Sequence, residues 1–189
     1  MQTKWDGAPS VVCGKHPANG MFFVGTKSVF NKTDPKICYD QNDVDIHYSD
    51  ASPDLKSKLK MCIEYFPSLN MDTVCQGELL FTSDVKAEDI EGEKLYTFKP
   101  NAITYAIPVN HPIGLALKKA KIGIVFHTSY TGNEIATMTA KAGAPKMKST
   151  ADVFLVDNDT PMDDISVDKS TLSKFEQNIS IVESMCKTS

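Results

Sequence analysis

The chain contains no arginine: all 20 of its Lys and Arg residues are lysines. A phosphate contact must therefore come from lysine ammonium groups, backbone N–H groups or hydroxyl groups, because no planar guanidinium group is available. No apolar run approaches the length that crosses a bilayer, and no apolar stretch follows Lys4 as it would in a signal peptide. We therefore expect a cytoplasmic protein, in the host cytoplasm if the source is viral, with no membrane partner.

Signals for disulfides and for metal binding are also scarce. The five cysteines include no C-x-x-C pair and are odd in number, so we interpret them as reduced thiols. The four histidines show no metal-ligand spacing. A net charge of -4 excludes a global basic field for nucleic acid but leaves a local basic groove possible.

Strand patterns dominate the sequence and predict an α+β domain of mostly antiparallel sheets with flanking helices. The clearest helix begins after Ser52, a suitable N-cap, and ends at Pro67. The polar segment 31–51 is expected to be a surface loop. The predicted strands cover 10–14, 21–30, 73–82, two short stretches within 95–108, 121–130 and 151–157, and further helical segments cover 112–120 and 165–189.

The sequence "KWDG" places Lys4, Asp6 and Gly7 at the end of a short predicted strand. Alone this pattern is weak, because about one chain of this length in a few tens would contain it by chance. A turn that reverses the chain at Asp6 and Gly7 would also explain it. Three further segments on predicted strands follow it: "GTKSVF" with Lys27, "QGELLF" with Glu78, and "AITYAIP" with Tyr105.

In these four segments and in their order, residues 1 to about 108 resemble the covalent nucleotidyltransferase superfamily. This superfamily includes ATP-dependent DNA ligases, RNA ligases and mRNA capping enzymes. Longer stretches around the same segments also look like ligase-like proteins of large tailed bacteriophages. The resemblance implies a nucleotidyltransferase (ATP-grasp-like) core, ATP and Mg2+ as cofactors, and transfer of AMP to a nucleic-acid end, with the oligomeric state left open.

The resemblance also implies a role for each residue. Lys4 would be the catalytic nucleophile that attacks the α-phosphate of ATP, and Lys27 or Mg2+ nearby would disfavour its charged form. Glu78 would bind the metal or the ribose. The other implied nucleotide-binding residues are Asp6 at the ribose or the lysine, Gly7 for close backbone approach, and Tyr105, or less well Phe98, stacking on adenine.

Each of these residues has an ordinary structural interpretation as well. Lys27 could be a solvated strand lysine, and Tyr105 could be a core aromatic. Glu78 lies in an otherwise apolar strand, where an unpaired carboxylate is costly. Trp5 alternates with Lys4 and is expected to pack into the core.

Two further elements of the superfamily lack a convincing match. "IGIVFHT" has Ile122 where a glutamate is expected and His127 where a lysine is expected. The "KMK" of residues 146–148 lies in an Ala/Gly/Pro-rich loop. We therefore expect a single nucleotidyltransferase-like domain over 1–189 that is truncated or excised. The alternatives are an inactive nucleotide-binding module and a phage structural or interaction protein on the same scaffold.

Overall fold

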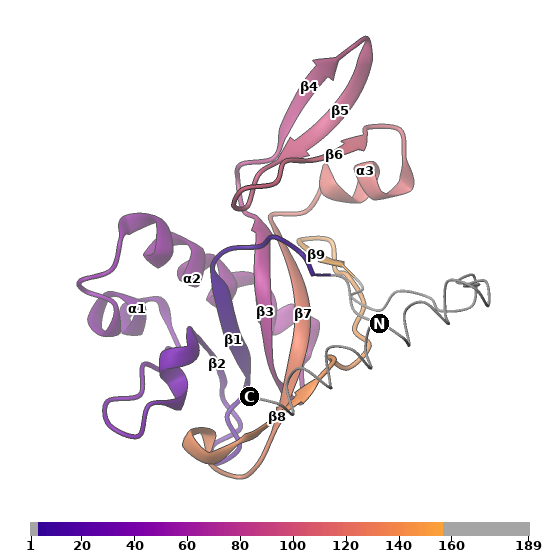
Figure 1. Ribbon diagram of the computed structural model, residues 1–189. Helices are drawn as coiled ribbons and strands as arrows, with labels where there is room; N and C mark the ends of the chain where they lie inside the picture. Colours follow the sequence, from indigo (N-terminus) through magenta and orange to yellow (C-terminus); the bar gives the residue numbers. More distant parts are fainter. Residues whose placement is uncertain (1–3, 157–189) are drawn as a thin grey trace, which may run out of the picture. The chain divides into compact units, whose positions relative to one another are not determined.

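A computed structural model describes residues 4–156, which belong to a compact unit spanning Gln2–Asp159. This part of the chain is α+β, as predicted, with short helices beside two sheets (Figure 1). The helical segment predicted for 165–189 lies outside the described residues. Within the described residues, no helix combines the length and the apolar character needed to cross a bilayer.

The larger sheet has six strands in the order β2-β1-β3-β7-β8, and β9 also pairs with β7. β8 lies antiparallel to the second half of β7, and β9 lies parallel to its first half. All other pairings in this sheet are antiparallel. The strands are β1 (Ser10–Lys15), β2 (Phe22–Gly25), β3 (Val74–Phe81), β7 (Ile122–Thr131), β8 (Thr139–Ala142) and β9 (Val153–Val156).

A smaller antiparallel sheet has the order β4-β5-β6 and is followed by a short helix (Figure 1). β4 was not predicted, because all five of its side chains are exposed and it therefore lacks an apolar alternation. The turn before β5 places Glu91 and Gly92 at φ of 55° and 85°, which brings β4 and β5 together. These elements are β4 (Lys86–Ile90), β5 (Glu93–Phe98), β6 (Tyr105–Pro108) and α3 (Pro112–Leu117).

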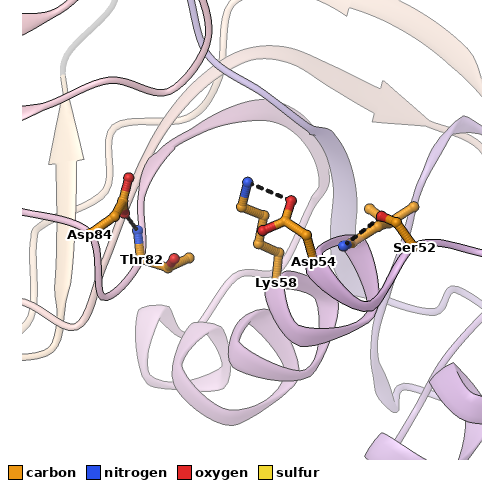
Figure 2. A network of polar contacts seen from close by, with 6 residues as sticks. Ser52, Asp54, Lys58, Thr82 and Asp84 are labelled. Carbon is orange, nitrogen blue, oxygen red and sulfur yellow. Dashed lines mark hydrogen bonds and ion pairs between the residues drawn. The ribbon is translucent and has the colours of Figure 1, made fainter.

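Helix α2 (Pro53–Tyr65) begins where the sequence predicted. The Ser52 side chain accepts a hydrogen bond from the Leu55 N–H at 3.2 Å, which satisfies one N–H of the first turn. Asp54 and Lys58 form an ion pair one turn apart, at 2.9 Å (Figure 2). The N-cap and the apolar stripe were therefore sufficient to locate this helix.

The prediction that 31–51 is only a loop was wrong, because this segment contains α1 (Gln41–His47). The Asp40 side chain accepts from the Asp43 N–H at 2.9 Å, and the Asp43 side chain accepts from the Asp40 N–H at 3.4 Å. This capping box stabilises a helix that buries only Val44. A helix with so few apolar residues has no periodic signal to detect.

The prediction of a strand through residue 30 was also wrong. β2 ends at Gly25, and Lys27–Phe30 form a short 3-10 helix, η1. The Thr26 side chain caps this helix, and Val29 is buried beneath it. The remaining 3-10 helices are η2 (Phe66–Leu69) and η3 (Ile135–Thr137).

The two faces of the larger sheet are covered differently. On one face, α1 and α2 pack against a core that includes Val11, Leu79 and Ile124. On the other face, one apolar cluster surrounds Val12 and a second, around Val125, joins the larger sheet to the smaller one. Between these two clusters, this second face carries the polar residues Gln76 and Glu78 of β3.

Candidate functional site

The "KWDG" segment runs beside the last residues of β3. The Ala8 N–H donates to the Leu79 carbonyl at 2.9 Å, and the Gly7 N–H donates to Glu78 Oε2 at 3.2 Å. A Cβ at residue 7 would lie 2.5 Å from the Glu78 Cβ and 2.9 Å from the Leu79 carbonyl oxygen. Gly7 is therefore needed for the close approach of this segment to β3, and its predicted role at a bound nucleotide stays a prediction.

Asp6 joins the same segment to the connection between β5 and β6. Its carboxylate accepts hydrogen bonds from Asn101 Nδ2 at 2.9 Å and from the N–H groups of Ala102 and Ile103, both at 2.7 Å. The Ile103 N–H is the main cause that lowers the pKa of Asp6 below its usual value, and Lys4 contributes to the same shift. In this structure the Asp6 carboxylate therefore holds a loop.

Tyr105 lies beside Asp6 and is surrounded by aromatic side chains. Its hydroxyl oxygen accepts from the Asp6 N–H at 3.0 Å. Its ring stacks on Phe98 at 5.3 Å between centroids and contacts Trp5 at 5.2 Å. Trp5 thus packs against the apolar cluster as predicted, and its buried Nε1 has no hydrogen-bond partner among the described residues.

The two lysines of the predicted site are both exposed. Lys4 directly precedes Trp5 and lies close enough to Asp6 to lower the pKa of that carboxyl. Lys27 follows the end of β2, where Gly25 is opposite Val12. Lys27 is the first residue of η1, whose Val29 packs in the apolar cluster with Val12 and Val74.

Hydrogen bonds and aromatic contacts therefore join Asp6, Gly7, Glu78 and Tyr105, and Lys4 adjoins this group. Lys27, at the start of η1, forms no hydrogen bond or ion pair with this group in the described part of the chain.

Sequence reasoning missed Gln76, which lies two residues before Glu78 on the same face of β3. Its side chain is buried, donates to Ser10 Oγ at 2.9 Å and accepts from the Tyr130 hydroxyl at 2.6 Å. The spacing of Gln76 and Glu78 in an apolar strand was the available signal, because alternate residues share a face. Register shifts between β3 and β7 flank residues 77–79, so Glu78 lies in an irregular part of the sheet.

The weaker motif matches have different positions. Ile122 is fully buried in the core beside the helices, so it does not reach the polar face. His127 lies where β7 bulges opposite Gln76 and Gly77, and its Nδ1 is 2.8 Å from Thr128 Oγ1. The "KMK" lysines are exposed in the segment between β8 and β9.

Glu78 fits a magnesium-binding role only as a single protein ligand. Among residues 4–156, no three His, Cys, Asp or Glu side chains converge as a metal-binding group. Mg2+ is often held by one or two carboxylates together with substrate phosphates and water, so one glutamate is compatible with it. Glu78 uses one oxygen for the Gly7 N–H, and hydrogen bonds within the described residues leave the other available.

The cysteines among the described residues offer no alternative nucleophile. Cys13, Cys38, Cys62 and Cys75 are free and buried, which agrees with the prediction of reduced thiols, and Cys186 lies outside the described residues. Burial raises the pKa of Cys38 and of Cys75 to about 12. A thiol with so high a pKa stays protonated and unreactive near neutral pH.

Comparison with known proteins adds one family and no function. No curated protein and no solved structure matches the chain. A family model described as a family of unknown function, DUF6267, matches residues 1–189. The chain therefore belongs to DUF6267, a family of unknown function.

Proposed function

We propose that this protein is an ATP-dependent nucleotidyltransferase of the ligase type, which forms a lysyl-AMP intermediate at Lys4. The observation that carries the proposal is the hydrogen bond between the Gly7 N–H and Glu78 Oε2, at 3.2 Å. It joins two of the segments that resemble the superfamily across 71 residues of sequence. The contact between Asp6 and Tyr105 brings a third segment to the same place.

The proposed reaction uses the free amine of Lys4. Its nitrogen attacks the α-phosphorus of ATP, a P–N bond forms, and the bond between the α-phosphorus and the bridging oxygen breaks to release pyrophosphate. The amine loses its proton to solvent, since no general base is assigned. AMP would then pass to a phosphorylated nucleic-acid end, which makes nucleic acid the proposed partner.

The chain's own groups supply positioning and charge. Contacts of Gly7 with β3 and of Asp6 with residues 101–103 hold the backbone beside Lys4 on two sides. Glu78 would hold Mg2+, which when bound offsets negative charge on the phosphates. Lys27, exposed at the start of η1, would add a point charge.

Incubation of the full chain with α-labelled ATP and Mg2+ tests this proposal. We expect label on the protein that is stable to alkali and labile to acid, as a phosphoramidate bond requires. Lys4→Arg should abolish it, because arginine keeps its proton and cannot attack phosphorus. Lys56→Arg is the matched control, because Lys56 lies on α2, on the opposite face of the sheet.

A nucleotide-binding module without catalysis is the second candidate. The contacts of Asp6 and Tyr105 favour it, because both residues are engaged in holding the structure together. Such a module would bind ATP reversibly and take up no label. Unchanged labelling of Lys4→Arg would instead refute the assignment of the nucleophile.

A further inference from the structure

Tyr48 is a buried residue at the C-terminal end of α1, and its hydroxyl lies against the turn that carries Lys27. The hydroxyl oxygen accepts from the Thr26 N–H at 2.9 Å. It also lies 3.2 Å from Thr26 Oγ1 and 3.1 Å from Ser28 Oγ, and these two hydroxyls are 2.9 Å apart. Three hydroxyl groups therefore hold the chain immediately before and after Lys27.

The 3-10 helix that begins at Lys27 contacts both faces of the sheet. Thr26 and Ser28 reach Tyr48, which belongs to the core on the helix-covered face. Val29, two residues after Lys27, is buried in the apolar cluster around Val12 on the opposite face, which also carries Gln76 and Glu78. The hydrogen bonds at Tyr48 therefore fix the start of a short helix that packs on the face of Glu78, and Lys27 is exposed on that helix.

The turn is closely packed around this hydroxyl group. A Cβ at Gly25 would lie 2.6 Å from the Lys36 carbonyl oxygen and 3.3 Å from the Tyr48 hydroxyl, so only glycine fits at the end of β2. The Lys36 N–H donates to the Ser28 carbonyl at 3.2 Å, and Lys36 Nζ lies 5.4 Å from the centre of the Tyr48 ring. Tyr48 therefore contacts the turn through its hydroxyl group and Lys36 through its ring.

Acidic residues of α1 are engaged elsewhere. Asp40 and Asp43 form the capping box, and Asp45 is ion-paired with Lys60 at 2.7 Å. These carboxylates therefore do not hold Lys27, whose ammonium group forms no ion pair within residues 4–156. A lysine with a fixed backbone and an unengaged ammonium group is suited to bind an anion from solution.

We propose that Tyr48 is a positioning residue that directs Lys27 toward the phosphate chain of a bound triphosphate. The inference rests on the proposed function, because it assigns a partner to Lys27 within the same site. A lysine acts on phosphate as a point charge, so its contribution depends on where the backbone places it. Because the chain has no arginine, no guanidinium group can take over this phosphate contact.

The test is a double-mutant cycle on the full chain, with calorimetric titration of inorganic tripolyphosphate in the presence of Mg2+. Lys27→Ala should weaken binding by about tenfold, as expected for one hydrogen bond to a charged group. Tyr48→Phe should weaken it by about threefold or more, and should add nothing in the Lys27→Ala background. Tyr39→Phe is the matched control, because it removes a tyrosine hydroxyl that accepts from Asn19 and does not contact the Thr26–Ser28 turn.

A merely structural tyrosine would give a different result. Tyr48→Phe would then weaken binding equally in both backgrounds, and that outcome would overturn the inference. If Tyr48→Phe does not fold, Ser28→Ala removes one of the three hydroxyls and must show the same non-additivity. Failure of the wild type to bind tripolyphosphate also refutes the inference, whereas binding without label on Lys4 refutes only the proposed function.

Discussion

Substitution of Gly7 by alanine tests whether the "KWDG" segment depends on its contact with β3. The added methyl group would lie 2.5 Å from the Glu78 Cβ and 2.9 Å from the Leu79 carbonyl oxygen. Neither atom is the mobile end of a side chain, so the segment must move away from the strand. The Gly7–Glu78 hydrogen bond and the bond between Ala8 N–H and Leu79 would then lengthen or break.

The magnitude follows from these contacts. Overpacking costs about 1–3 kcal/mol, and each lost hydrogen bond costs about 1 kcal/mol. Because movement of the segment relieves the overpacking as it breaks the hydrogen bonds, the two costs do not add in full. Alanine also restricts the unfolded chain, which offsets about 0.4–1 kcal/mol. We therefore expect Gly7→Ala to lower the free energy of unfolding by about 1–3 kcal/mol, and to remove labelling at Lys4.

Urea unfolding followed by tryptophan fluorescence measures this effect, because Trp5 is the only tryptophan and lies two residues from the substitution. Gly20→Ala is the control: its φ is 70° and a Cβ there would meet nothing within 4 Å. That control should cost only the strain of a left-handed backbone, about 1 kcal/mol, and should leave labelling intact. A Gly7→Ala protein as stable as the wild type would show that this segment is not held against β3.

Two further predictions concern residues that hold the site together. The depressed pKa of Asp6 means that its stabilising contribution is present above its unfolded pKa and is lost as the pH falls through the folded value. Below about pH 4, the free energy of unfolding measured with urea should therefore fall less in Asp6→Asn than in the wild type. An equal fall in both proteins would contradict this. Gln76→Leu removes the acceptor of the Tyr130 hydroxyl and the donor to Ser10 Oγ, which keeps only its 3.5 Å contact with the Gly77 carbonyl oxygen. Urea unfolding should show a loss of about 1–3 kcal/mol, and no loss would contradict the structural role of this network.

The sequence predicted those elements that bury a regular apolar pattern. α2 has an N-cap at Ser52 and buries Leu59, and β3 is an apolar run in which only Glu78 is partly exposed. α1 and β4 escaped prediction because one buries a single residue and the other buries none. Their formation depends on a capping box and on a turn, which are local signals without periodicity.

The candidate site, too, could be predicted from the sequence only in part. The order of the four segments could be read from the sequence, but their convergence depends on pairings between residues 66 to 99 positions apart. Such pairings follow from the register of the whole sheet, which no single segment contains. Gln76 illustrates the limit: its spacing from Glu78 was visible, whereas its two partners, Ser10 and Tyr130, lie on other strands.

The state of Lys4 distinguishes it from the lysines that stabilise the fold. Lys15, Lys58 and Lys60 each form an ion pair with an aspartate, so their charge has a structural partner. Within the described residues Lys4 has no such ion pair, and the one aspartate beside it, Asp6, receives three hydrogen bonds from residues 101–103. The backbone at Lys4 is thus held from two sheets while its amine stays unengaged. Under the proposed function this combination supplies what an attacking amine requires, a positioned backbone and an unpaired nitrogen. Loss of label in Lys4→Arg with retention in Lys56→Arg would distinguish Lys4 from the other lysines that lack an ion pair.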